Sequence, residues 1–253
     1  MSRVTRLESH LEGRVRVLRL VNPARKNALD TLGYEALITA FEDAARDEDV
    51  RALVMTGSES CFCSGNDLDD FVTHPIADAS HPAYRFMATL AEFDKPVVAA
   101  VEGPAVGIGA TLLLHCDLVY AGDDARMHLP FVQLGVCPEF ASTYVLPALV
   151  GHQRAAQLLM LGEPLGAAEA CRLNLINRVV EKGTALAMAL EVAQRLAQTP
   201  PQALRQTKRL LRQGGRAAFD AAMQAELAVL VRALGSDEFN EAMAARRKTR
   251  AGG

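Results

Sequence analysis

The sequence predicts an α/β fold whose chain ends in a run of helices. Short apolar segments rich in β-branched residues alternate with amphipathic segments over roughly the first 180 residues, and this alternation is typical of parallel strands connected by helices. Apolar residues then recur at helical spacing almost to the end of the chain. We therefore expect an α/β core over residues 1–198 and a helical region over residues 199–253 that mediates oligomerisation.

The predicted strands are short and mostly apolar. They are residues 4–7, 15–21, 51–56, 97–101, 118–121 and 179–180. The first two are expected to flank a turn at Glu12 and Gly13. Residues 57–70 are polar around Gly65 and are predicted to form a loop.

The predicted helices carry apolar residues three and four positions apart. They are residues 31–46, 82–93, 110–114, 141–150, 153–161, 167–173, 184–198, 202–213, 216–234 and 236–248. The basic residues of the eighth helix share one face, which we expect to be in contact with solvent, and they are Arg205, Lys208, Arg209 and Arg212.

Composition and charge exclude several classes of protein. Half of the 253 residues are apolar and 23% are charged, as in a globular protein, and the net charge of −3 favours neither nucleic acid nor an anionic membrane. No apolar run is long enough to span a bilayer. The first ten residues lack the apolar centre of a signal peptide, and the final RAGG matches no peroxisomal or ER address. We expect a cytoplasmic protein with reduced thiols at Cys61, Cys63, Cys116, Cys137 and Cys171.

Residues 95–117 form the most informative segment of the chain. A buried strand leads into a turn that contains Gly103, Gly107 and Gly109, and an apolar helix follows. Glycines allow a tight turn, and a helix N-terminus presents free N–H groups and a partial positive charge. The segment is therefore suited to hold an anion, or an oxygen that becomes anionic during a reaction.

Three segments together resemble the crotonase superfamily, which contains enoyl-CoA hydratases and isomerases. These are NPARKNALD, CFCSGNDLDDF and KPVVAAVEGPAVGIGATLLLHCDLVYA, in this order. The resemblance covers most of the chain, from about Val15 to Lys248. It implies a crotonase-like spiral of ββα units with a helical C-terminal trimerisation region, and acyl-CoA thioester substrates. It also implies a homotrimer or dimer of trimers, with no cofactor beyond the coenzyme A of the substrate.

The resemblance places the two backbone donors of an oxyanion hole on Asn66 and Ile108. Asn66 follows Gly65, and Ile108 lies between Gly107 and Gly109. A thioester enolate needs donors aimed at its oxygen, which amide N–H groups supply in a fixed geometry. The alternative is that the glycines only make tight turns.

Two positions depart from the hydratase pattern of the family. Hydratases carry two glutamates there, and this chain has Thr111 and Phe131 instead. Addition of water to a double bond needs a base that activates the water and an acid that protonates carbon. Neither residue can do this, so the sequence argues against the usual hydratase chemistry.

Glu139 supplies a carboxylate in a different place. Its surroundings resemble the Δ3,Δ2-enoyl-CoA isomerase branch, through Pro130, Phe131, Leu134, Gly135, Pro138, Glu139, Ser142 and Pro147. In that branch the glutamate is the single acid/base, and its apolar neighbours are expected to raise its pKa. Phe140 replaces the usual glycine and is expected to alter the loop or narrow the acyl pocket. The alternative role for Glu139 is an exposed cap of the following helix.

The resemblance also implies contacts with substrate or CoA for residues near these positions, namely Arg25, Lys26, Ser64, Gly65, Asp67, Leu68, Gly107, Gly109, Thr111 and Phe131. His128 is expected near the pocket and His115 in the core. The basic residues near the C-terminus, Arg246, Arg247, Lys248 and Arg250, are expected to be solvated. No metal-ligand or nucleotide-phosphate motif is present. Two alternative functions stay open. One is hydratase-like or other crotonase chemistry, and the other is non-catalytic binding of a CoA thioester.

Overall fold

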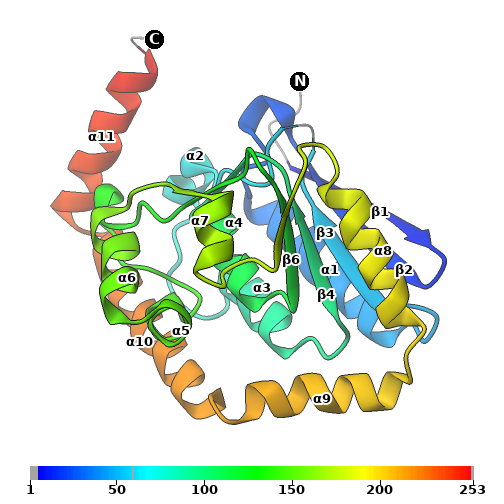
Figure 1. Cartoon of the computed structure of the whole chain (residues 1–253). Helices are drawn as coiled ribbons and strands as arrows, with labels where there is room; N and C mark the ends of the chain where they lie inside the picture. Colours follow the sequence, from blue (N-terminus) through cyan, green and yellow to red (C-terminus); the bar gives the residue numbers. More distant parts are fainter. Residues whose placement is uncertain (1–4, 59, 252–253) are drawn as a thin grey trace.

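The computed structural model describes residues 5–58 and 60–251. Its larger sheet has the order β1-β2-β3-β4-β6-β9 (Figure 1). The strands are β1 (Arg6–Glu12), β2 (Val15–Val21), β3 (Ala52–Thr56), β4 (Val97–Val101), β6 (Leu118–Gly122) and β9 (Arg178–Val180). β1 and β2 form an antiparallel hairpin, and every later pairing in this sheet is parallel.

A smaller sheet with the order β5-β7-β8 lies beside the larger one. It contains β5 (Pro104–Val106), β7 (Arg126–His128) and β8 (Leu165–Gly166). The chain passes from β4 to β5 and from β6 to β7, so successive segments contribute a strand to each sheet.

Helices cover both faces of the larger sheet because its buried strands point side chains alternately to each face. On one face, Val54 and Val98 pack against the alanines of α8 (Ala185–Ala197). On the other face, Leu53 and Val97 belong to the main core with α1 (Thr31–Arg46) and α3 (Pro82–Glu92). Figure 1 shows α8 and α1 on opposite sides of the strands.

The C-terminal helices share this core. They are α9 (Pro201–Gln213), α10 (Arg216–Leu234) and α11 (Asp237–Ala251). Met223 and Leu230 of α10 and Phe239 of α11 are buried within the main core cluster. Residues 199–251 are therefore packed onto the α/β part, and α11 extends away at its C-terminal end (Figure 1).

The predicted solvent-facing side of α9 is wrong for Lys208 and Arg212, whereas Arg209 is exposed as expected. Lys208 is buried, and its Nζ donates to the carboxylate of Asp117 at 2.7 Å and to the carbonyl of Lys95 at 2.6 Å. Arg212 donates to the carbonyl of His115 at 2.8 Å. The apolar residues Leu210 and Leu211 are exposed instead, at 62% and 82%. The cations turn inward because a carboxylate and backbone carbonyls accept their hydrogen bonds.

The α/β class with a helical C-terminal region is confirmed, and several local predictions change. The first strand is β1, which extends to Glu12; residue 4 lies outside the described residues. A short helix, α2 (Leu68–Thr73), forms within and beyond the predicted loop, because the Asp67 side chain accepts from the N–H groups of Asp69 and Asp70. The three strands of the smaller sheet were not predicted.

The remaining helices follow the predictions with small shifts. α4 (Ile108–Thr111) starts earlier than predicted and continues as a 3-10 turn over Leu112–His115. The other elements are α5 (Ser142–Val150), α6 (His152–Ala156) with a π turn over Gln157–Leu161, α7 (Ala167–Arg172) and 3-10 turns at Pro23–Arg25 and Val132–Leu134. Within the described residues, we find no helix with the length and apolar character needed to cross a membrane.

Candidate active site

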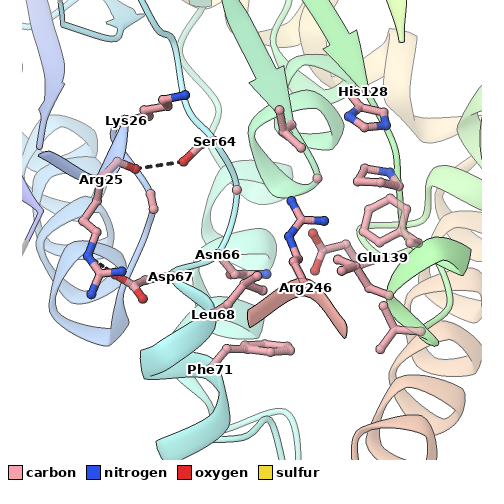
Figure 2. Close-up of a pocket in the computed structure, with 18 of the residues that line it drawn as sticks. Arg25, Lys26, Ser64, Asn66, Asp67, Leu68, Phe71, His128, Glu139 and Arg246 are labelled. Carbon is pink, nitrogen blue, oxygen red and sulfur yellow. Dashed lines mark hydrogen bonds and ion pairs between the residues drawn. The ribbon is translucent and has the colours of Figure 1, made fainter. Parts of the chain in front are cut away.

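A pocket of about 430 Å³ lies between the loop after β5, the loop before α2 and the C-terminal helices. Most of the predicted site residues line it, namely Arg25, Lys26, Ser64, Gly65, Asn66, Asp67, Leu68, Gly107, Phe131 and Glu139. Apolar side chains complete the wall, including Phe71, Leu134, Val136, Leu230 and Phe239. Its volume and mostly apolar lining suit a small acyl group with a few polar contacts. Figure 2 shows the pocket with Asn66 and Glu139 labelled.

The first predicted donor, the N–H of Asn66, is aimed by strand-like pairing. Leu29 donates to the carbonyl of Gly65 at 2.8 Å and accepts from the N–H of Asp67 at 2.8 Å. The N–H of Asn66 therefore points to the opposite side from Leu29. Within residues 5–58 and 60–251 it has no protein acceptor. The Asn66 side chain is held separately, because its amide oxygen accepts from the hydroxyl of Tyr34.

The second predicted donor, the N–H of Ile108, lies at the first position of α4. Gly107 precedes it with φ +54°, a conformation that favours glycine, and Gly107 donates to the carbonyl of His128 at 2.9 Å. The first N–H groups of a helix have no intrahelical acceptor. The N–H of Ile108 is likewise without an acceptor among the described residues.

The two donor loops are in direct contact. A Cβ on Gly65 would lie 2.9 Å from the carbonyl oxygen of Val106 and 4.0 Å from the Cα of Gly107. A Cβ on Gly109 would lie 2.6 Å from the carbonyl oxygen of Cys63. Glycine is therefore needed at both places to let the loops approach. This close approach brings the residues that carry the two free N–H groups together, as an oxyanion hole requires.

Glu139 is buried at the wall of the same pocket and is 5% exposed. Its Oε1 has no hydrogen-bond partner in the described part of the chain. Burial, together with the negative charge of Glu226, raises the pKa of Glu139 to about 8. The alternative role as an exposed helix cap is wrong, because the carboxylate is neither exposed nor bonded to the N-terminus of α5.

Phe140 does not narrow the pocket, which corrects part of the prediction. Its ring is 1% exposed, stacks on His115 with ring centroids 3.7 Å apart, and is not among the residues that line the pocket. Phe140 and Ala141 both have positive φ, at 60° and 52°, which is a conformation that the usual glycine adopts readily, so the expected change in the loop stays a prediction. His115 is the predicted core histidine, and its Nε2 lies 2.7 Å from the carbonyl oxygen of Phe140.

Three residues of the predicted site lie behind the pocket wall. Ile108, Gly109 and Thr111 are buried and are not among the residues that line the pocket. The predicted role of Ile108 needs only its backbone N–H, and Gly109 leaves the space that lets the loop of Cys63 approach. The Thr111 hydroxyl lies 3.5 Å from the carbonyl oxygen of Ile108 in its own helix, so the structure gives Thr111 a packing role.

The predicted CoA-contacting residues form the rim of the pocket. Arg25 pairs with Asp69 at 2.9 Å and lies 3.6 Å from Asp67. The Ser64 hydroxyl donates to the carbonyl of Arg25 at 2.9 Å, which fixes the two loops together (Figure 2). Asp67 is engaged by Arg25 and also caps α2. Lys26 is exposed and has no salt bridge to another described residue.

Further polar residues reach the pocket. His128 lines it and donates from Nε2 to the carbonyl of Gly162 at 2.8 Å. Arg246 of α11 is exposed, as predicted for the basic tail, and it also lines the pocket (Figure 2). The side chains of Arg247, Lys248 and Arg250 lie outside the described residues. Among residues 5–58 and 60–251, no group of three or more histidine, cysteine or acidic side chains is arranged to hold a metal ion.

Glu226 is the residue of this region that sequence reasoning missed. It lies on α10 and is 6% exposed. Its carboxylate accepts from the N–H groups of Ala141 and Thr143, directly after the predicted base. Glu226 belongs to the otherwise apolar face of α10, between Met223 and Leu230, and a glutamate in such a stripe is a signal that could have drawn attention to it.

Comparison with known proteins identifies similar chains. The sequence profile described as Enoyl-CoA hydratase/isomerase matches residues 10–251. Human enoyl-CoA delta isomerase 2 is 35% identical over 228 residues, which are 87% of this chain and 58% of that protein, so the chain spans little more than half of this relative. The 2,3-dehydroadipyl-CoA hydratase of Escherichia coli K12 is 33% identical over 92% of this chain and 91% of its own. The structure of Pseudomonas aeruginosa OdaA superposes with a TM-score of 0.92 and 41% identity, covering 96% of this chain and 98% of that one.

Proposed function

The chain belongs to the enoyl-CoA hydratase/isomerase family, and on that premise we propose that it is a Δ3,Δ2-enoyl-CoA isomerase with Glu139 as its single acid/base. The substrate is an acyl-CoA thioester, and the coenzyme A that it carries is the only cofactor in the reaction. Arg25, Lys26, Ser64 and Leu68 are proposed to contact the CoA portion at the rim of the pocket.

The observation that supports this proposal is the number of pocket carboxylates that have an oxygen without a hydrogen-bond partner. Among the described residues that line it, the acidic side chains are Asp67 and Glu139. Asp67 is engaged by α2 and Arg25, whereas one oxygen of Glu139 has no partner. A single free carboxylate suits a 1,3 proton shift, because the same group can remove a proton and return it.

In the proposed reaction, the Glu139 carboxylate removes a proton from C2 of a 3-enoyl thioester. The electron pair of the broken C–H bond moves into the conjugated system and onto the thioester oxygen. The N–H groups of Asn66 and Ile108 donate hydrogen bonds to this oxygen, and they stabilise it more strongly as its negative charge develops. Glu139 then gives the proton to C4, so that the double bond moves from C3–C4 to C2–C3 and the carboxylate is regenerated.

The protonation of Glu139 supports the same role. A pKa of about 8 leaves a fraction of the carboxylate ionised near neutral pH and makes it a stronger base than an ordinary glutamate. It also lets the protonated form donate to C4 without a second acid. Burial by the surrounding apolar wall is the main cause.

Hydration is the second candidate, because a hydratase relative matches the chain over nearly its whole length. The residues present argue against it. Thr111 is packed in its own helix and Phe131 is apolar, so neither position supplies a carboxylate that activates water. Hydration would need Glu139 to act both as base and as acid with a water molecule in the pocket.

Turnover of trans-3-hexenoyl-CoA beside crotonyl-CoA tests the proposal. We expect isomerisation of the first and little hydration of the second, with Glu139→Gln reducing isomerisation by at least about 10³-fold. Wild-type isomerisation by Glu139→Gln would show that the assignment of the base is wrong. Binding of acetoacetyl-CoA without turnover of either substrate would instead favour a non-catalytic CoA-binding protein.

We also propose that the chain forms a homotrimer or a dimer of trimers. The exposed leucines of α9, Leu210 and Leu211, support a further protein contact on the outside of the C-terminal helices. Light scattering of the purified chain would measure its mass directly, and a monomer at micromolar concentration would contradict this proposal.

A further inference from the structure

The loop that carries Glu139 has a conformation that its own sequence does not favour. Phe140 and Ala141 both lie in the left-handed region, with φ of 60° and 52°. Each such non-glycine residue costs about 1 kcal/mol or more unless its surroundings hold it there. Ala141 is also the residue before α5, and alanine has no side chain that can cap a helix. Another part of the chain must therefore hold this loop.

Glu226 supplies that support from α10. Its Oε2 accepts from the N–H of Ala141 at 2.6 Å, and its Oε1 accepts from the N–H and the hydroxyl of Thr143 at 2.9 Å and 2.6 Å. The Cys137 thiol lies 3.5 Å from the backbone carbonyl of Glu226, on the other side of Glu139 in sequence. One residue of α10 is thus bonded to the chain both before and after Glu139.

We propose that Glu226 is a positioning residue of this active site, which holds the Glu139 loop in its strained conformation and caps α5 from another helix. Its negative charge at the N-terminus of α5 is stabilised by the free N–H groups there. The inference rests on the proposed function, because it assigns to Glu226 the task of placing the base of that reaction. Glu226 itself is not among the residues that line the pocket.

The two glutamates are suited to different protonation states. Burial raises the pKa of Glu226, and the three hydrogen bonds that it accepts oppose this rise because they favour the ionised form. Glu139 has an unpartnered oxygen, and its pKa is raised both by burial and by the charge of Glu226. When two neighbouring carboxylates lie in unequal environments, their pKa values differ, so that one group stays charged while the other exchanges protons.

Other titratable groups also face Glu139. The pKa values of Tyr34 on α1 and Cys63 in the first donor loop are raised in part by its charge, and that of Cys137 in its own loop is raised by both glutamates. His128 of β7 and Arg246 of α11 line the same pocket. Tyr34, Cys63 and Cys137 stay neutral near pH 8 because burial raises their pKa values, so among these acids Glu226 is the charged neighbour that a substitution can remove.

Glu226→Gln in the full chain tests the inference. The control is Asp220→Asn on the same helix, because the described side-chain contacts of Asp220 are with Arg216 alone. We expect Glu226→Gln to reduce kcat for the 3-enoyl thioester at least about tenfold, because misplacement of a reacting group by about 1 Å costs up to 10²-fold. Asp220→Asn is expected to keep wild-type kcat. Circular dichroism and thermal unfolding report whether each variant is folded.

The pKa of Glu139 distinguishes a positioning role of Glu226 from a purely structural one, because loss of stability alone would leave this pKa unchanged. Titration of ¹³C-labelled glutamate side chains, assigned with Glu139→Gln, follows its carboxyl group directly. We expect the Glu139 midpoint and the acid limb of the kcat/KM profile to move to lower pH in Glu226→Gln. Glu226→Asp retains the charge and is expected to restore the higher midpoint in part. If Glu226→Gln does not fold, Glu226→Asp and Thr143→Val, which removes one donor to Glu226, are compared by the same titration.

The outcomes separate this inference from the proposed function. An unchanged Glu139 titration and kcat in folded Glu226→Gln would overturn the inference, and so would a loss of kcat that only follows the folded fraction. A shifted Glu139 titration in a protein that isomerises no 3-enoyl thioester would contradict the proposed function, while the support of the Glu139 loop by Glu226 would stand.

Discussion

Gly109→Ala tests whether close contact between the two donor loops is needed for activity. Gly109 follows the proposed donor Ile108, and its backbone approaches Cys63 in the loop of the other donor. An added Cβ would lie 2.6 Å from the Cys63 carbonyl oxygen, whereas ordinary contact begins at 3.4 Å. The difference of 0.8 Å must be taken up by movement of one backbone against the other. The obstacle is a carbonyl group, so no flexible side chain can move aside.

The expected loss of activity follows from that displacement. A shift of about 1 Å between groups that act on one atom costs about 10²-fold in rate, and removal of one oxyanion donor costs about 10²–10³-fold. We therefore expect kcat to fall about 10²-fold in Gly109→Ala. Overpacking should also lower the free energy of unfolding by about 1–3 kcal/mol, which urea denaturation can measure while most of the protein stays folded.

Gly214→Ala is the matched control. Gly214 lies at the end of α9 with a negative φ, and no heavy atom lies within 4 Å of the position that an added Cβ would take. The same chemical change is expected to leave kcat unaltered there. Wild-type kcat in folded Gly109→Ala would refute the argument, because it would mean that the donors tolerate separation of the loops or take no part in the reaction.

Three further predictions concern stability. The pKa of Glu139 in the folded state is raised to about 8, so the free energy of unfolding of the wild type should fall as pH rises from about 4.5 to about 8. In urea denaturation at pH 8, Glu139→Gln should be more stable than the wild type by more than about 1 kcal/mol. Equal stability of the two proteins would contradict this prediction. Asp117→Asn removes the carboxylate that is bonded to the buried Lys208 cation. This change should lower the free energy of unfolding by about 2 kcal/mol or more. An unchanged urea midpoint would argue that Lys208 is neutral in the folded protein. Phe140→Gly relieves a positive φ but removes a buried ring, so a net loss of about 2–4 kcal/mol is expected, with the acyl-chain preference unchanged because Phe140 is not in the pocket wall.

The larger elements were predictable because their sequences carry a strong local pattern. The strand β4 is a run of five buried apolar residues, and its predicted bounds agree with the structure. The strands of the smaller sheet have only two or three residues each. They begin or end at residues such as Pro104 and Arg126 that carry no strand signal, and they are held by pairing with distant strands.

The site was predictable where its residues are close in sequence. Asn66 and Ile108 each lie beside glycines that mark their loops, and Glu139 lies in a recognisable segment. Glu226 was not found, because the loop that it holds is far away in the chain, and its place in the apolar face of α10 indicates burial without naming that partner. The predicted orientation of α9 was wrong for a similar reason, because the groups that accept hydrogen bonds from Lys208 belong to Asp117 and Lys95, which are far away in sequence.

The pairing of Leu29 with the segment around Asn66 has a consequence for protein engineering. Leu29 is bonded to Gly65 and Asp67, the two neighbours of Asn66, so the direction of the Asn66 N–H is set without its side chain. The same holds for Ile108, whose N–H direction is set by Gly107 and α4. Every amino acid except proline has this N–H group, so residue 66 is open to substitution, whereas Ile108 is fully buried in the main core and is restricted to residues that fill the same space. Because the Asn66 side chain lines the pocket, a library at residue 66 can alter the pocket wall while the direction of the proposed donor N–H is kept.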